Sequence, residues 1–197
     1  MKDILKRAGW IFLAALFVVT GLGVGLVAFW QATHPANNNS SQTQTSQAPH
    51  CGSDPSLQFN APTSGAKLAG AKLASFTPTA HIPAISCIDA KVGSTGKAVQ
   101  YSSTIVANYT GAVAATGVIF QSSLDNSGQP FTAQLNSTDP SKGLIQGWDL
   151  DLLGMRAGGE RRLLIPAALA YGANPPSGSG IPANADLVFD ITVLAVQ

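Results

Sequence analysis

The chain has 197 residues, enough for one domain of ordinary size and an additional segment. Only 11% of the residues are charged and the formal net charge is +1, which excludes the strongly basic surface that nucleic-acid binding requires. The two cysteines, Cys51 and Cys87, are too few for a disulfide framework and do not have the spacing of zinc ligands.

The first predicted element is an uncharged apolar stretch, residues 10–30, with a tryptophan at each end. A helix of this length at ~1.5 Å per residue spans roughly 30 Å, the thickness of a hydrocarbon core, so we predict a single transmembrane helix. A cleaved signal peptide is the alternative, although its apolar core is usually ~7–15 residues. Basic residues lie in the segment 1–9 and none follows the stretch until Lys67. The positive-inside rule therefore predicts a cytoplasmic N-terminus and an extracytoplasmic remainder.

A polar segment follows, residues 31–56, rich in Asn, Gln, Ser and Thr. Such a sequence cannot bury enough apolar surface to offset the entropy lost on ordering, so we predict a flexible linker. Residues 57–95 are predicted to be an N-terminal extension of the exported module, and we call them the extension. The sequence leaves open whether the extension packs on the module or lengthens the linker.

Cys51 lies in the predicted linker and Cys87 in the extension. An extracytoplasmic location allows a disulfide between them, but two unpaired thiols are slightly favoured. A metal site that adds His50 and His81 is conceivable, although nothing in the spacing supports it. We expect no metal and no cofactor.

Two segments have the alternation of half-buried strands. Ile105, Ala107 and Tyr109 fall on one face of the first strand. The second strand, near the C-terminus, places on one face Leu187, Phe189, Ile191, Val193 and Ala195.

One segment between these strands has a helical period instead. Ile145, Trp148, Leu152 and Met155 recur at steps of three and four residues, and Gly158–Gly159 is predicted to end the helix. One apolar-faced helix among several strands indicates a sheet curved over that helix, an α+β arrangement.

A short turn of helix is predicted between Pro166 and Gly172, because proline suits the start of a helix and glycine its end. This turn ends on Tyr171, next to a loop rich in glycine and proline. The charged residues around the longer helix are predicted to form a solvated surface: Asp149, Asp151, Glu160, Arg161 and Arg162.

The order of several motifs resembles a known family. "NYTG", "IFQSS", "PFTAQL", "GLIQGWDLDLLGMRAGGERRLLIPAALAYG" and "IPANADLVFDITVL" follow one another as in FKBP-type peptidyl-prolyl cis-trans isomerases. The resemblance extends over residues 96–197. It implies an antiparallel β-sheet wrapped around one α-helix, with a shallow aromatic pocket between them.

The resemblance also implies which residues form the site. Tyr171, Trp148 and Ile145 are expected to carry catalysis. The Tyr171 hydroxyl and the Ile145 N–H would donate hydrogen bonds to substrate carbonyls, and Trp148 would form the floor of the pocket. The residues expected to bind substrate are Tyr109, Phe120, Gln121, Phe131, Leu144, Ile181 and Phe189.

Three positions depart from the family pattern. Gln121 replaces an aspartate, Ala133 replaces an aromatic residue, and Gly180 replaces an aliphatic residue. The pocket is therefore expected to be wider and less acidic on one side. Catalytic rate and inhibitor affinity are the properties that these changes affect.

The predicted function is isomerisation of X–Pro bonds in exported or membrane-proximal proteins. The expected partners are proline-containing polypeptides and, through the N-terminal helix, the lipid bilayer, with no nucleic acid. The resemblance implies that macrolide-type inhibitors could bind. The alternative is a non-catalytic module that binds proline peptides or acts as a chaperone with the same fold.

Overall fold

The computed structural model describes residues 50–61, 67–125, 128–136 and 144–197. They all belong to one compact unit, Ser46–Gln197. The predicted transmembrane helix, the N-terminal segment and most of the predicted linker lie outside the described residues. Within the described ranges, no helix is long and apolar enough to cross a bilayer.

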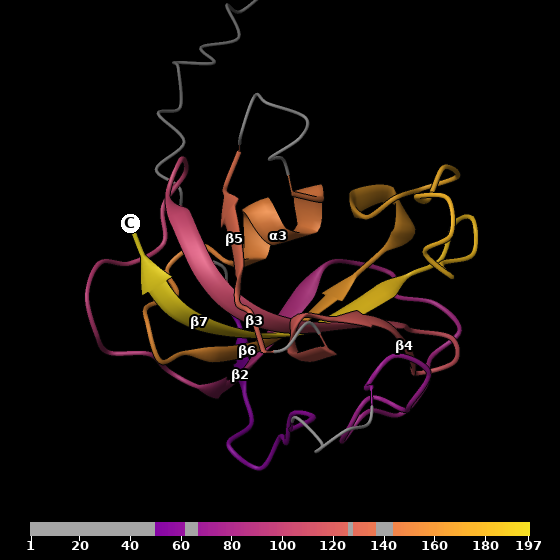
Figure 1. The fold of residues 1–197 in the computed structure, drawn as a ribbon, viewed down its shortest axis with the longest axis horizontal. Helices are drawn as coiled ribbons and strands as arrows, with labels where there is room; N and C mark the ends of the chain where they lie inside the picture. The colour runs from indigo at the N-terminus through magenta and orange to yellow at the C-terminus, as the bar shows by residue number, and fades with distance from the viewer. Residues whose placement is uncertain (1–49, 62–66, 126–127, 137–143) are drawn as a thin grey trace, which may run out of the picture. The chain divides into compact units, whose positions relative to one another are not determined.

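The described elements are seven strands, one α-helix and two short 3₁₀-helices (Figure 1). In chain order they are β1 (Gly52–Ser53), β2 (Ser86–Lys91), β3 (Thr104–Val113), β4 (Val118–Ser122), η1 (Ser123–Asp125), β5 (Phe131–Gln134), α3 (Gln146–Asp151), β6 (Glu160–Ile165), η2 (Ala167–Leu169) and β7 (Leu187–Val196). The strands form one sheet in the order β1-β2-β6-β7-β3-β4, and β5 also pairs with β3. The prediction of a purely antiparallel sheet is wrong in one place, because β1 pairs with β2 in parallel.

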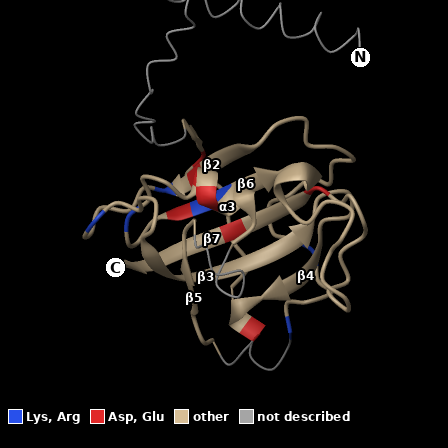
Figure 2. Ribbon diagram, turned by 90° about the horizontal axis from the view of Figure 1, so that it is seen from above, with Lys and Arg blue, Asp and Glu red and all other residues tan. Residues whose placement is uncertain are grey.

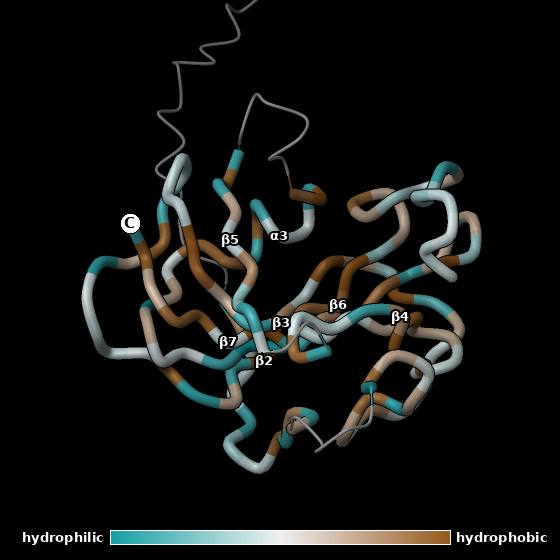
Figure 3. The backbone as a smooth tube through the Cα atoms, viewed as in Figure 1, coloured by the Kyte–Doolittle hydropathy of each residue, from teal (hydrophilic) through white to brown (hydrophobic). Residues whose placement is uncertain are grey.

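The main core lies between the sheet and α3 (Figure 1). The predicted inner face of β7 is confirmed for Leu187, Phe189, Ile191 and Val193, which all join this core. Hydrophobic residues follow the strands beneath α3 (Figure 3). The sheet and the single α-helix therefore enclose one apolar layer, as expected for an α+β fold.

The helix α3 is shorter than predicted. It ends at Asp151 rather than at Gly158–Gly159. Gly154 has φ +80°, outside the helical region, and its N–H donates to the Val99 carbonyl. Leu152 and Met155 are nevertheless buried in the core. The spacing therefore predicted their burial correctly, although the backbone after Asp151 is not helical.

The sequence left open where the extension lies: its last part, β2, is a strand of the sheet, and the part before β2 packs on the face of the sheet opposite α3. Leu68, Leu73 and Ile82 form a second buried cluster with residues of the sheet such as Ile119 and Val188. Each face of the sheet is thus covered, one by α3 and the other by the extension. Val188 is buried for this reason, although it lies on the outward face of β7.

Cys51 and Cys87 form a disulfide, so the preference for two unpaired thiols is wrong. The parallel pairing of β1 with β2 brings together two cysteines that lie 36 residues apart. The pairing also removes both thiols from the conceivable metal site. The end of the predicted linker belongs to the folded unit, because Gly52 and Ser53 are strand residues.

The prediction of a solvated charged surface is wrong for the two arginines and for Asp151. Arg161 and Arg162 are only 7% and 2% exposed, and Asp151 is also buried. Arg162 Nε lies 2.6 Å from Asp190 Oδ1, and its terminal nitrogens donate to the carbonyls of Ala74 and Ser75 in the extension. Figure 2 shows acidic and basic residues together where β6 meets its neighbours. The two arginines are paired inside the fold, Arg161 with Asp89 and Arg162 with Asp190, as buried charges usually are, whereas Oδ2 of Asp151 has no hydrogen-bond partner among the described residues.

Candidate active site

Nine of the ten predicted site residues line one hollow of about 240 Å³ over the core. They come from β3, β4, β5, β7, the segment leading into α3, the helix itself and the turn after η2. We call this hollow the aromatic pocket. Its lining residues are Tyr109, Phe120, Gln121, Phe131, Leu144, Ile145, Trp148, Tyr171 and Phe189.

Trp148 stands at the centre of the ring cluster. Its ring centroid lies 5.3 Å from that of Phe189, 5.5 Å from that of Tyr109 and 6.1 Å from that of Phe131. All three pairs are close to perpendicular, the edge-to-face arrangement that aromatic quadrupoles favour. The rings therefore hold one another in fixed positions and form a rigid apolar floor.

Gly147 sets the position of Trp148. A Cβ atom at Gly147 would lie 2.6 Å from Cγ2 of Ile165, so only glycine allows α3 to approach β6 this closely. The indole Nε1 of Trp148 is buried and has no hydrogen-bond partner among the described residues.

Gly111 has the same function for two other rings. A Cβ atom there would lie 2.6 Å from Cζ of Phe120 and 2.7 Å from Cε1 of Phe189. These two phenylalanines lie 5.8 Å apart in an edge-to-face pair that rests on the bare backbone of β3. The chain can bring them together only because position 111 has no side chain.

Tyr171 comes from the turn that follows η2. Asp186 Oδ1 accepts the Ala167 N–H at 2.7 Å, and the Gly172 N–H donates to the Ala167 carbonyl, so the turn is fixed at both ends. No described residue forms a hydrogen bond with the Tyr171 hydroxyl, which belongs to a half-buried side chain on the pocket wall. Within the described ranges the hydroxyl thus keeps its proton available for a ligand group.

Ile145 is the N-cap residue of α3 and has an extended backbone conformation. Its carbonyl accepts the Trp148 N–H at 2.9 Å, whereas its own N–H has no acceptor in the described part of the chain. The first N–H groups of a helix have no partner within the helix. The pocket thus offers a backbone donor in addition to a phenolic donor.

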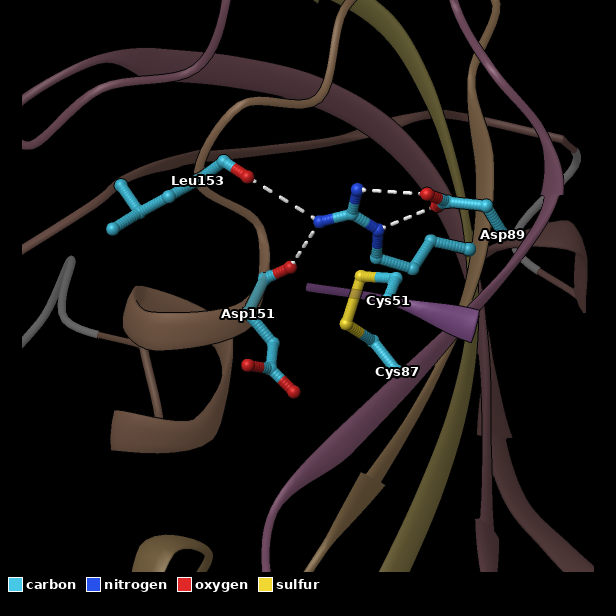
Figure 4. Close-up of polar contacts among 6 residues, drawn as sticks. Cys51, Cys87, Asp89, Asp151 and Leu153 are labelled. Atoms are coloured by element: carbon cyan, nitrogen blue, oxygen red, sulfur yellow. Dashed lines mark hydrogen bonds and ion pairs between the residues drawn. A yellow bond between two sulfur atoms is a disulfide. The ribbon is translucent and has the colours of Figure 1, made fainter. Parts of the chain in front are cut away.

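Arg161 fixes the other end of α3 (Figure 4). Its Nη1 donates to the carbonyls of Asp151 and Leu153, at 2.5 and 3.3 Å, and its Nε lies 2.7 Å from Asp89 Oδ1. A cation at a helix C-terminus satisfies free carbonyls and complements the helix dipole. Asp89 belongs to β2, so this strand also supports the helix that carries Trp148.

The described lining of the aromatic pocket contains no charged side chain. Burial raises the pKa of the Tyr109 hydroxyl to about 12, and the neighbouring Tyr171 adds to this shift. Burial also raises the pKa of the Tyr171 hydroxyl above its ordinary value. Both phenols keep their protons at neutral pH, so the described lining of the aromatic pocket is neutral.

We expect the Tyr171 hydroxyl to stay protonated as the pH rises through about 10, the ordinary pKa of tyrosine. The raised pKa of Tyr171 keeps the donating hydroxyl protonated beyond that point. Both hydroxyls have a higher pKa in the folded chain than in the unfolded chain, so their protonation stabilises the fold below about pH 10. This stabilisation is lost as the pH rises through the folded-state pKa. Spectrophotometric titration of the tyrosines and melting temperature from about pH 7 to pH 10.5 test this, and ionisation of Tyr171 centred at pH 10 in the folded protein would contradict it.

One predicted residue lies outside the aromatic pocket. Ile181 is buried and lines an adjoining hollow, which it shares with Phe120, Gln121 and Tyr171. Ala133, where the family has a second aromatic, is buried and does not line the pocket.

The sequence reasoning missed the residues that position the site rather than form it, namely Gly111, Gly147, Arg161 and Asp186. Alternation along β3 could have shown that Gly111 points to the same face as Tyr109. The other three carry no local signal, because their partners lie far away in the sequence.

Comparison with known proteins gives a consistent result. The family model described as "FKBP-type peptidyl-prolyl cis-trans isomerase" matches residues 96–194. FK506-binding protein 4 of Neurospora crassa is 36% identical over 153 residues, covering 74% of this chain and 30% of that protein. FK506-binding protein 4 of Chaetomium thermophilum is 37% identical over 116 residues, covering 59% of this chain and 22% of that protein. This chain thus spans less than a third of the length of these relatives. The crystal structure of FkpA from Escherichia coli is similar with a TM-score of 0.49 and 34% identity, covering 57% of this chain and 48% of that one.

Proposed function

The chain belongs to the FKBP-type peptidyl-prolyl cis-trans isomerase family, and from this premise we propose that it catalyses rotation about X–Pro bonds in polypeptides. The observation that carries the proposal is the uncharged aromatic pocket with two free donors, the Tyr171 hydroxyl and the Ile145 N–H. Uncatalysed rotation must overcome ~18–20 kcal/mol, because twisting the bond removes amide resonance.

The pocket can lower this barrier without a nucleophile or a cofactor. The planar amide is charge-separated and well solvated by water, whereas the twisted amide is less polar. A water-poor aromatic pocket therefore stabilises the twisted form relative to the planar one, which is differential binding of the transition state. A 10⁴-fold acceleration corresponds to about 5.5 kcal/mol of such preference.

In this proposal each residue has a defined part. The proline ring rests on Trp148, with Phe189 and Tyr109 as side walls. The Tyr171 hydroxyl donates to one substrate carbonyl and the Ile145 N–H to another, which aligns the peptide for rotation. Gln121 stands where the family has an aspartate, so the wall beside Phe120 is uncharged.

We expect Tyr171→Phe to lower kcat/KM on a proline tetrapeptide about threefold to tenfold, the size of one neutral hydrogen bond. Tyr101→Phe is the matched control, because Tyr101 is an exposed tyrosine outside the pocket. A direct-probe isomerisation assay of both variants checks the prediction. Equal kcat/KM for wild type and Tyr171→Phe would remove the catalytic role of this hydroxyl.

A second candidate function is binding of proline segments without useful turnover. The replacements at Gln121 and Ala133 favour it, because they alter the family's pocket on one side. The same assay, combined with titration of a fluorescent proline peptide, separates the two functions. Binding without acceleration would support the second one. By relation to the FK506-binding proteins, we further propose that the aromatic pocket accepts FK506-type ligands.

We also propose that residues 10–30 anchor the protein in a membrane, with the N-terminus in the cytoplasm and the isomerase module outside it. The support is the uncharged apolar stretch, the basic residues before it, and the Cys51–Cys87 disulfide, a bond typical of extracytoplasmic proteins. In this location the clients are exported or membrane-proximal proteins. Protease added to intact cells should degrade the module, and full protection would contradict the orientation.

A further inference from the structure

Two further hollows continue from the aromatic pocket along the same side of the molecule. The first, of about 340 Å³, shares Phe120, Gln121 and Tyr171 with the aromatic pocket. The second, of about 430 Å³, shares Phe120, Gly178 and Ser179 with the first. The three hollows therefore adjoin one another, and we call the two beyond the aromatic pocket the extended groove.

The far wall of the extended groove belongs to the extension, through Ala69 and Gly70. The loop after Tyr171 forms the facing wall, with Gly178, Gly180 and Pro182. The two walls are thus parts of the chain about a hundred residues apart, which meet across β4. In Figure 1 the loop between η2 and β7 lies above β4 and the extension lies below it.

The wall from the extension is held in place by several hydrogen bonds. Asp125 accepts the N–H groups of Leu68 and Ala69, at 2.6 and 2.9 Å. The Gly70 N–H donates to the Ile119 carbonyl, and the Ile119 N–H donates to the Ala71 carbonyl. This hydrogen bonding makes the wall a formed part of the module.

The chemistry of the groove favours a neutral, apolar occupant. Among the described residues that line the 340 Å³ and 430 Å³ hollows, none is charged. Val118 and Pro182 provide apolar surface, while serine hydroxyls and glycine backbone provide polar groups for an extended main chain. A charged side chain placed here would lose its hydration without gaining a partner.

The occupant follows from continuity with the aromatic pocket. A polypeptide whose proline sits on Trp148 must leave the pocket in both directions, advancing ~3.3–3.6 Å with each extended residue. Phe120 is common to all three hollows, so one end of the substrate passes this ring and enters the groove.

We propose that the extended groove is a substrate subsite, built jointly by the extension and the loop after Tyr171, which binds apolar side chains of the substrate beyond the immediate neighbours of the proline. The inference rests on the proposed isomerase function, and it makes long, unfolded, apolar polypeptides the preferred substrate class. Small side chains at Ala69, Gly178 and Gly180 keep the subsite open.

The test compares proline tetrapeptides with peptides lengthened on either side by leucine residues or by glutamate residues. Both kcat/KM and the dissociation constant are measured on the full chain. Leucine extension on one side should raise kcat/KM about tenfold and lower the dissociation constant about tenfold. This is the gain expected from burying one leucine-sized side chain. Glutamate extension on that side should give no gain.

Ala69→Trp should abolish the preference for the leucine-extended peptide, because the indole fills the groove from an exposed position. Gly178→Asn is the second variant; its Cβ meets open space and asparagine tolerates the left-handed φ of +77° at this position. Ala80→Trp is the matched control, an exposed alanine of the extension that lines none of the three hollows. Melting temperatures show that each variant is folded.

The outcomes separate the two proposals. If wild type does not accelerate isomerisation of any peptide, the proposed isomerase function fails, and the ratio of dissociation constants still tests the subsite. If wild type treats short and leucine-extended peptides alike, the subsite is overturned while the isomerase function stands. A preference that survives in both Ala69→Trp and Gly178→Asn also overturns the subsite.

Discussion

Replacement of Arg162 by methionine is expected to lower the free energy of unfolding by about 3–5 kcal/mol, the range for breaking a buried ion pair from one side. Asp190 is almost fully buried and would lose its partner at 2.6 Å. The carbonyls of Ala74 and Ser75 would lose their donors as well, which loosens the extension. Urea unfolding followed by tryptophan fluorescence measures the loss.

The effect of this variant should depend on pH. Burial raises the pKa of Asp190, against the opposing hydrogen bond and charge of Arg162. A raised folded-state pKa contributes stability below the unfolded value of about 3.8, and this contribution is lost as the pH rises through the folded value. Without Arg162 the carboxyl takes up a proton more readily, so Arg162→Met should be less damaging near pH 4 than at pH 7.

Two controls define the Arg162 result. Arg156→Met removes an exposed arginine and should cost less than about 1 kcal/mol, as is usual for surface substitutions. The double variant Arg162→Met with Asp190→Leu should recover part of the loss, because no buried charge remains unpaired. If Arg162→Met and the wild type had the same urea midpoint of unfolding, the buried pair would add nothing to stability.

Gly111→Ala is expected to lower the free energy of unfolding by about 1–3 kcal/mol, the cost typical of overpacking in a dense interior, and to lower kcat/KM as the pocket walls shift. The new methyl group would lie less than 3 Å from ring atoms of both Phe120 and Phe189. One ring must move, and either movement changes the walls of the aromatic pocket. The isomerisation assay and a peptide titration measure the change together.

Gly52→Ala is the matched control for this substitution. The added Cβ would meet only the Cys87 carbonyl, at 3.8 Å, an ordinary contact. We expect wild-type activity and stability from it. If Gly111→Ala kept full activity and an unchanged melting temperature, the two rings would not need the close packing that the structure gives them.

Local patterns predicted the parts of the fold that depend on neighbours in sequence. Alternation located the buried face of β7, and the spacing from Ile145 to Met155 located buried residues around α3. The pocket residues were predicted from the family resemblance, in which each residue is assigned by the motif that contains it. The structure brings nine of them to one hollow, and their roles in catalysis remain predictions.

The features that the sequence did not reveal depend on distant partners. Arg162 looks like a surface residue until β7 supplies Asp190 and the extension supplies two carbonyls. The disulfide depends on a parallel strand pair of two residues, too short to have a sequence pattern. The end of α3 at Asp151 was missed because Gly154, with its positive φ, lies within an apolar period that continues past it.

The hydrogen bonds between the extension and β4 close one edge of the sheet. The outer border of a sheet presents unpaired N–H and C=O groups, and these recruit strands from other molecules into aggregates. Here the Gly70 N–H and the Ala71 carbonyl already occupy both main-chain groups of Ile119, and the Leu73 N–H donates to the Gly117 carbonyl. The extension thus covers this edge of the sheet, so β4 cannot pair with a strand of another molecule at these positions.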